Sequence, residues 1–403
     1  MEYQVLQKVY YKSRNDYERI YQERFNSEYA VHLDFDIKGA PAFFVQTPEI
    51  ISMLTDILRM NLAVSGLCRA LPGAAIDQFS KRCLIDEIVL TNSIEGVRST
   101  RKEISDILEE LETASKGKRF YGLVQKYHML MTKAELPLDS CEDIRKVYDE
   151  LVLAEVAAEG KSNVPDGKWF RKDSVSVYSE SQKEIHKGLY PEEKIIQAME
   201  KALTFLQDNS CDILYRISIF HYLMEYIHPF YDGNGRLGRF ICSYLLSQEL
   251  APVTAYRLSY TIKEHMNDYY QAFSTCNASL NKGDLTPFLE MFLRIIRISV
   301  EKLKESLQEN FVRLDRISQR IPELMQNSDK KMEELYFLLA QAALFSEFGV
   351  STKVVMDYLN VSRSTLNKKL EKIPAELLCK MKRGNVNYYS LNVDVLERKS
   401  GTA

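Results

Sequence analysis

Residues 228–239, HPFYDGNGRLGR, decide how the centre of this 403-residue chain folds. The apolar run 217–227 before them has helical spacing, and Pro229 ends that helix because a proline ring clashes with the preceding turn. Gly233 and Gly235 permit a tight turn whose backbone amides can approach a ligand closely. The apolar run after the turn predicts a second helix, so the stretch is expected to form helix, turn and helix.

The charges around this turn predict a site for a polyanion. The N-terminus of the second helix carries free amides and a partial positive charge, which attract anions. Arg236 and Arg239 share one face of its first turns, where the helix dipole disfavours cations, so they indicate a bound di- or triphosphate. Asp232 offers a hard oxygen ligand for Mg²⁺, and His228 offers an imidazole suited to general base catalysis. The alternative is a glycine-rich turn with surface arginines.

The stretch resembles the signature of Fic-domain proteins, H-x-F-x-[D/E]-G-N-G-R-x-x-R, at every specified position. Similarity extends upstream to HYLMEYIHPF, downstream to GDLTPFLEMFL from Gly283, and to the region 168–190. It therefore covers roughly residues 40–300. The resemblance implies a mainly α protein with the helical core of the Fic fold and a small β-hairpin flap.

From this resemblance we expect nucleotidyl transfer, in which AMP passes from ATP to a Tyr, Thr or Ser hydroxyl of a target protein and pyrophosphate leaves. ATP is then the substrate and Mg²⁺ the cofactor. The family roles fall on His228 (base), Phe230 (anchor of the loop), Asp232 (magnesium ligand), Gly233, Asn234 and Gly235 (anion nest), Arg236 (β-phosphate) and Arg239 (γ-phosphate).

Three further positions bear on this expectation. Family members that phosphorylate their targets carry Lys where this chain has Gly235, so the glycine favours AMP transfer. Tyr270 and Asn277 fall where the family lines the adenine pocket, although either could instead face the core or solvent. His221 lies seven residues before His228 on the same helix face, and we expect a structural role for it.

The segment TNSIEG, residues 91–96, resembles the inhibitory motif [S/T]-x-x-x-E-[G/N] of class II Fic proteins. Thr91 and Glu95 are four residues apart and would share a helix face. The resemblance implies that Glu95 pairs with Arg239 and so withholds that guanidinium from the γ-phosphate. The alternative is a glutamate at a helix end followed by a glycine cap. Some relatives use the same glutamate to remove AMP, and this second activity stays open.

Residues 168–190 break the helical pattern and predict a short hairpin, because Val175 and Val177 alternate with serines. In the family this flap pairs with the target protein as an added strand. The alternative is a plain solvent-exposed hairpin.

The C-terminal residues predict a small basic domain. Residues 351–373 form two short helices, with Ser362 as N-cap of the second, and residues 377–391 form a hairpin. This order resembles a winged helix-turn-helix. Residues 351–400 hold ten Lys and Arg against five Asp and Glu, a local charge of +5 that favours contact with DNA. Docking of a protein or dimerisation stays open.

The expected faces of this domain are specific. Val354, Val355, Tyr358 and Leu359 form the apolar face of the first short helix. In the second, the exposed face consists of Arg363, Ser364, Thr365, Asn367 and Lys368. The hairpin adds Lys380, Lys382 and Arg383.

Composition excludes several classes of protein. With 45% apolar residues and a net charge of −3, the chain is expected to be a soluble globular protein rather than a disordered one. No membrane span or signal peptide is expected. The seven scattered cysteines indicate reduced thiols and a cytoplasmic location.

We therefore expect three parts: an N-terminal helical region over 1–115 with the inhibitory motif, a catalytic core over 116–325 that includes the flap and a long helix from 289 to 314, and a winged helix-turn-helix over 326–403. The expected activity is protein adenylyl transfer, held off by Glu95. The alternatives are a DNA-binding regulator that senses ATP without turnover, and transfer of another phosphoryl group. A homodimer is a further expectation from the resemblance.

Overall fold

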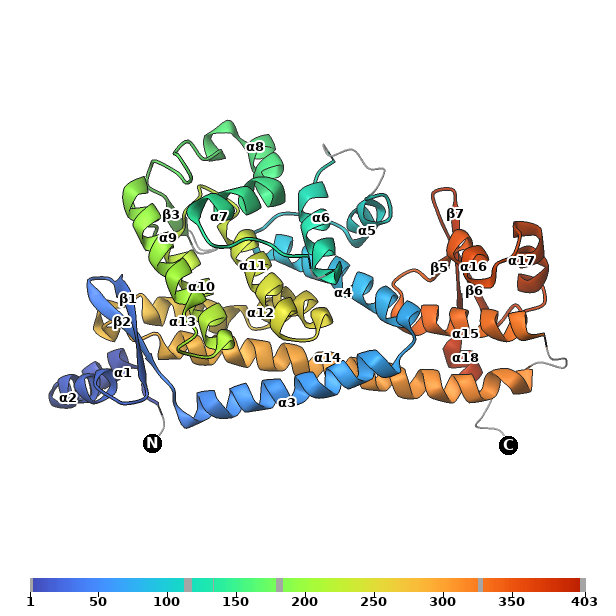
Figure 1. Cartoon of the computed structure of the whole chain (residues 1–403), viewed down its shortest axis with the longest axis horizontal. Coiled ribbons are helices and arrows are strands. Elements are labelled where there is room, and N and C mark those ends of the chain that lie inside the picture. The colour runs from blue at the N-terminus through green and yellow to red at the C-terminus, as the bar shows by residue number, and fades with distance from the viewer. Residues whose placement is uncertain (1–2, 112–117, 133, 179–183, 325–328, 399–403) are drawn as a thin grey trace. The chain divides into compact units, whose positions relative to one another are not determined.

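Helices α10 (Ile213–Ile227) and α11 (Asn234–Glu249) pack side by side in the computed structural model, which confirms the expected helix, turn and helix (Figure 1). The structure describes residues 3–111, 118–132, 134–178, 184–324 and 329–398. The chain forms two compact units, Met1–Asn61 with Leu84–Glu301, and Leu62–Cys83 with Lys302–Ala403. The expected boundaries after 115 and after 325 lie outside the described residues.

The sequence explains where α10 and α11 begin and end. The Asp212 side chain accepts a hydrogen bond from the Leu214 amide and caps the start of α10. His228 follows the helix in the left-handed region, at φ 51°. Gly233 precedes α11 at φ 80°, a conformation that favours glycine. The turn between the helices is therefore fixed by local residues.

The N-terminal part of the first unit contains a hairpin that the sequence analysis missed. Helices α1 (Leu6–Lys12) and α2 (Arg14–Phe25) precede strands β1 (Ala30–Ile37) and β2 (Ala40–Val45), which pair antiparallel. Inward residues alternate along the second half of β1, and this period of two was the available signal. The sequence analysis expected hairpins at 168–190 and 377–391 but none in this region.

Helix α3 (Pro48–Ala70) follows the hairpin and leads to α4 (Gly73–Ile94). By length and composition α3 could cross a membrane, since its most apolar window has a mean hydropathy of 1.4 and 17% of that window is buried. One such helix is weak evidence, because core helices of water-soluble proteins pass the same test. The absence of a membrane span stays a prediction.

The middle of the first unit is helical. The α-helices are α5 (Arg101–Glu109), α6 (Tyr121–Met129), α7 (Cys141–Tyr148) and α8 (Ala154–Glu159), and a π-helix over Asp149–Leu153 joins the last two. Short 3₁₀ helices cover Leu130–Thr132, Lys161–Asn163, Pro252–Tyr256, Ser279–Asn281 and Ile321–Leu324.

The expected flap contains a short antiparallel pair, β3 (Ser176–Tyr178) and β4 (Glu184–Lys187). This confirms a hairpin within 168–190, although residues 179–183 of the expected flap lie outside the described residues. Helix α9 (Glu192–Gln207) follows and packs on α10.

Three helices complete the C-terminal side of the core: α12 (Leu258–Glu264), α13 (Met266–Cys276) and α14 (Thr286–Arg320). The last has 35 residues and confirms the expected long helix. All seven cysteines carry free thiols, as expected.

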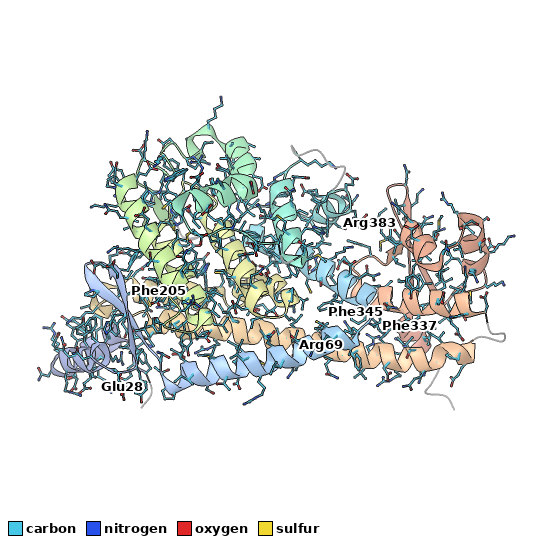
Figure 2. The ribbon with its side chains drawn as sticks, in the orientation of Figure 1. Glu28, Arg69, Phe205, Phe337, Phe345 and Arg383 are labelled. Carbon is cyan, nitrogen blue, oxygen red and sulfur yellow. The ribbon has the colours of Figure 1, made fainter. Side chains whose placement is uncertain are left out.

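The second unit combines helices with a small sheet. Its elements after α14 are α15 (Lys330–Phe345), β5 (Val350–Ser351), α16 (Thr352–Leu359), α17 (Arg363–Leu370), β6 (Leu378–Arg383), β7 (Val386–Leu391) and α18 (Val393–Arg398). The antiparallel sheet has the order β5-β7-β6. Figure 2 labels Phe345 on α15, whose ring meets Phe79 of the same unit edge-on at 6.2 Å.

The second unit confirms some local expectations and corrects one. The Ser362 hydroxyl accepts from the Thr365 amide, as expected of an N-cap. Val355 and Leu359 are buried, but Val354 and Tyr358 are about half exposed, so the expected apolar face of α16 was too wide. The reason is that a short helix packed on one side buries only a narrow stripe.

Candidate nucleotide site

The turn after α10 is held by Phe230, whose side chain is fully buried. Its ring stacks on Tyr148 of α7 at 3.7 Å between centroids and meets Phe170 edge-on at 5.5 Å. This agrees with the anchoring role expected for Phe230. The Tyr148 hydroxyl also donates to the Asp232 carbonyl at 3.2 Å, so α7 contacts the turn twice.

Asn234 closes the turn with its side chain. Its Oδ1 accepts from the Phe230 amide at 2.9 Å, and its Nδ2 donates to the Phe230 carbonyl at 2.8 Å. The Gly233 amide donates to Asp232 Oδ1 at 2.5 Å. A Cβ at Gly233 would come within 3.0 Å of Val152 in the π-helix, so this helix lies directly against the glycine loop.

A cleft opens above this loop and encloses about 770 Å³, open solvent at its mouth included. All the residues proposed from the sequence for the site line it except Arg236 and the anchor Phe230. Its lining consists of Glu95, His186, Glu225, His228, Tyr231, Asp232, Gly233, Asn234, Gly235, Arg239, Tyr269, Tyr270, Phe273 and Asn277. The cleft thus joins an imidazole, a glycine loop, a guanidinium and aromatic rings.

Arg239 makes the ion pair with Glu95 that the family resemblance implies. Its Nη2 lies 2.8 Å from Glu95 Oε1. Its Nε donates to the Thr91 hydroxyl at 2.8 Å, and its Nη2 donates to the Thr91 carbonyl at 3.0 Å. Burial opposes the charged form of Arg239, but Glu95, Tyr269 and Glu225 together outweigh it and the pKa of Arg239 is raised.

The Glu95 carboxylate also covers the glycine loop. A Cβ built on Gly235 would collide with Glu95 Oε1 and lie 2.9 Å from Arg239 Nη1. Glu95 therefore occupies the space directly over the second glycine of the expected anion nest.

Arg236 lies outside the cleft, fully buried. Its Nη1 is 2.9 Å from Glu155 Oε2 on α8, and its Nη2 is 3.9 Å from Asp232 Oδ1. Burial raises the pKa of Glu155 to about 7, opposed by the charge of Arg236. Contact of Arg236 with a β-phosphate stays a prediction, and in this structure the side chain braces the loop against α8.

His228 points into the cleft with 15% of its side chain exposed. Burial lowers the pKa of His228 to about 3, helped by neighbouring His186 and Arg171. The imidazole is therefore neutral at pH 7, which is the form that a general base needs.

Glu225 is a cleft residue that the sequence analysis missed. Its Oε2 lies 3.8 Å from His228 Nδ1. Burial and the nearby charge of Glu95 raise the pKa of Glu225 to about 8, although Arg239 opposes the shift. Its position in the last turn of α10, three residues before His228, was the available signal.

The other end of the cleft is aromatic. Tyr270 is 39% exposed there, and the Asn277 Oδ1 accepts from the Tyr222 hydroxyl at 2.7 Å. His221 is fully buried and its Nε2 lies 2.7 Å from the Tyr269 hydroxyl, in agreement with a structural role. Such an aromatic surface suits a planar base.

The cleft offers one carboxylate suited to Mg²⁺ beside the glycine loop. The Asp232 side chain is 34% exposed. Among the described residues, no group of three or more His, Cys, Asp or Glu side chains could hold a metal. This donor set fits Mg²⁺, which proteins commonly bind through one or two carboxylates together with substrate phosphates and water.

Comparison with known proteins agrees with this geometry. Residues 137–246 match the model of the Fic/DOC family. The chain is 24% identical over 282 residues to a protein named protein adenylyltransferase Fic from Drosophila grimshawi, covering 67% of this chain and 52% of that protein. A relative of the same name from Drosophila persimilis is 24% identical over 290 residues, with 68% and 51% covered. The chain thus spans about half the length of these curated relatives.

The fold resembles that of a solved Fic family protein from Desulfovibrio desulfuricans. The TM-score is 0.51 at 19% identity, and the match covers 86% of this chain and 96% of the other. The expected fold class, a mainly helical Fic fold with small hairpins, is therefore confirmed.

Proposed function

We propose that this protein transfers AMP from ATP to a Tyr, Thr or Ser hydroxyl of a target protein, with Mg²⁺ as cofactor. The observation that carries the proposal is the neutral imidazole of His228 in one cleft with the glycine loop and Arg239. The match of residues 137–246 to the Fic/DOC family and the names of the Drosophila relatives support it.

The chemistry follows from these side chains. His228 takes the proton of the target hydroxyl, whose oxygen attacks the α-phosphorus while pyrophosphate leaves. The amides at the start of α11 face the phosphates and stabilise the charge that develops on them. Asp232 would hold Mg²⁺, which supplies positive charge at the phosphates. The aromatic end of the cleft would hold the adenine.

We further propose that Glu95 inhibits the transfer. The ion pair with Arg239 at 2.8 Å occupies the guanidinium that a γ-phosphate would need, and the carboxylate lies over Gly235. ATP would then bind with its α-phosphate out of line, and a misplacement of about 1 Å can lower the rate ~100-fold.

The test is to incubate wild type, Glu95→Gly and Glu95→Gly/His228→Ala with a cell lysate and α-labelled ATP. We expect Glu95→Gly to raise protein labelling about 10- to 100-fold, and His228→Ala to abolish it. Absence of label in Glu95→Gly would overturn the proposed activity. Equal labelling by wild type and Glu95→Gly would overturn the inhibition alone, and label from γ-labelled ATP would indicate phosphoryl transfer.

A second candidate function, DNA binding, is favoured by the exposed residues of the second unit. The side chains of Arg363, Ser364, Thr365, Asn367 and Lys368 on α17 are exposed, as expected, and so are Lys380 and Lys382 on β6. We propose that α16, α17 and the β6–β7 hairpin act as a winged helix on DNA. Arg383 is half-buried rather than exposed, because its guanidinium packs 3.9 Å over the Phe348 ring.

Filter binding with mixed duplex DNA at several salt concentrations tests this second proposal. Affinity should fall steeply with salt, because phosphate contacts release counterions. Lys368→Glu should weaken binding, whereas Arg316→Glu, at an exposed position of α14 in the same unit, should not. If affinity changes neither with salt nor with Lys368→Glu, the proposed DNA contact is ruled out and the domain is expected to bind a protein instead.

A further inference from the structure

Four consecutive carbonyl groups, the last two of α10 and the two that follow it, are bound by donors from the base of the flap. Helix ends leave carbonyls without partners inside the helix, so such groups need donors from elsewhere. Four consecutive carbonyls are bound: Tyr226 by His186 Nε2 at 2.6 Å, Ile227 by the Leu189 amide at 3.1 Å, His228 by Arg171 Nε at 2.9 Å and Pro229 by the Arg171 amide at 3.1 Å. Arg171 makes two of these contacts.

The guanidinium of Arg171 is fully buried and bound to backbone alone among the described residues. Besides the His228 carbonyl, it donates to Leu189 at 2.8 Å and to Asp173 at 2.5 Å. No carboxylate of the described chain forms an ion pair with it. A buried cation without a counterion is unfavourable. The carbonyls at the end of a helix offset part of this cost, because cations are favoured at a helix C-terminus. We therefore ask what role keeps Arg171 at this position.

The space around this contact is filled. A Cβ built on Gly188, between the flap strand and α9, would collide with Arg171 Nη2 and come within 3.0 Å of the His228 Cβ. Gly188 at the base of the flap therefore lies directly against both His228 and the guanidinium of Arg171. His228 itself is in the left-handed region, at φ 51° and ψ 63°, which a non-glycine residue adopts only where its surroundings hold it.

We propose that Arg171 is a positioning residue for AMP transfer, which holds the turn that presents His228 and joins that turn to the flap that carries the target. The inference rests on the proposed function. Arg171 lies 57 positions before His228, outside the signature motif. Its role is to fix the position of the catalytic base relative to the flap.

The charge of Arg171 has a second effect. The charged and titratable groups facing His228 are Arg171 before β3, His186 on β4, Glu225 on α10 and Asp232 in the loop. After burial, His186 and Arg171 keep the pKa of His228 low. Removing the cation should raise the pKa of the imidazole, so that it becomes protonated at higher pH.

The experiment compares Arg171→Met and Arg171→Lys in the Glu95→Gly background, with Arg216→Met as matched control. Arg216 also donates to a backbone carbonyl, that of Leu206 at 2.7 Å, but it does not line the cleft. We expect Arg171→Met to lower kcat at least tenfold with KM for ATP changed less than twofold. The acidic limb of its pH–rate profile should move to higher pH.

Arg171→Lys should restore the position of the acidic limb and part of kcat, while Arg216→Met should match the background. The imidazole of His228 can also be titrated by NMR, identified by the signal missing in His228→Ala, and its pKa should rise in Arg171→Met. If Arg171→Met does not fold, Gly188→Ala can replace it. The added methyl group would displace Arg171, and kcat should fall.

Equal loss in Arg171→Met and Arg171→Lys, with an unmoved pH profile and an unmoved imidazole titration, would make Arg171 merely structural and overturn the inference. Full activity in Arg171→Met would overturn it as well. If the Glu95→Gly background itself transfers no AMP, the proposed function fails, and the titration still decides whether Arg171 acts on His228.

Discussion

At the scale of single residues, the cleft depends on carboxyl groups whose environments differ. Glu95 is paired with Arg239 and partly exposed, with 28% of its side chain accessible. Glu225 is more enclosed and its pKa lies at about 8, so it carries a proton at neutral pH. Glu225 can therefore stay protonated while Glu95 pairs with Arg239 as a carboxylate. This lowers the repulsion between Glu225 and Glu95.

Glu225→Gln should remove a pH dependence of stability. Because the folded pKa of about 8 is above the ordinary value, the protonated group stabilises the fold fully below about pH 4.5, and this contribution is lost as pH rises to 8. Wild type should therefore lose stability relative to the variant by on the order of 1 kcal/mol per pH unit over that window. Urea unfolding of both proteins at pH 5, 6.5 and 8 measures the difference, and a constant difference contradicts the assignment.

At the scale of secondary structure, α4 presents one face to the core through residues four apart. Glu87 accepts from the Ser259 amide at 2.9 Å, Thr91 accepts from Arg239 Nε at 2.8 Å, and Glu95 follows one turn later. Burial raises the pKa of Glu87 to about 7, opposed by its hydrogen bonds to Ser259. The end of α4 thus places the Glu95 carboxylate, one residue beyond the helix, over the glycine loop.

Thr91→Val should release part of the inhibition. The change removes the hydroxyl that binds Arg239 but leaves the Thr91 carbonyl and the Glu95 ion pair, so labelling from α-labelled ATP should rise less than in Glu95→Gly. About three- to tenfold is expected, because a typical hydrogen bond contributes about 0.5–1.5 kcal/mol and the Thr91 carbonyl and Glu95 still bind Arg239. Lys81→Ala, which changes an exposed pair with Asp77 on the same helix, serves as the control and should have no effect.

At the scale of the whole molecule, the net charge of −3 conceals a buried arginine pair, the carboxylates that neutralise it, and an exposed basic surface in the second unit. Arg236 and Arg239 leave α11 toward different partners, Glu155 and Glu95, so one braces the loop and the other faces the cleft. The average composition carries none of this information.

ATP with Mg²⁺ should stabilise the first unit more in Glu95→Gly than in wild type. A ligand that binds the folded state adds about 2.7 kcal/mol at a concentration of 100 Kd, and freeing Arg239 should tighten binding of the γ-phosphate. Calorimetry should therefore show a larger rise in the melting temperature of the variant. Equal shifts in both proteins would contradict the competition between Glu95 and ATP.

The sequence by itself determined the local features of this protein. Helix, turn and helix around residues 228–239, the flap hairpin and the cap at Ser362 all follow from short-range spacing and residue type. The pairing of Glu95 with Arg239 was expected only from the family resemblance. The buried stripe of α16 was predicted too wide because burial depends on what packs against an element. The hairpin β1–β2 did have a local signal, the period of two along β1, which the sequence analysis missed.

Only the tertiary structure decided which polar groups meet across long stretches of chain. Arg171 reaches the His228 carbonyl over 57 positions, Arg236 reaches Glu155 over 81, and Glu87 reaches Ser259 over 172. No local pattern encodes such pairs, because a buried charge takes whichever acceptor the packed helices place beside it. Whether an arginine of the signature contacts phosphate or braces the loop is set by that packing.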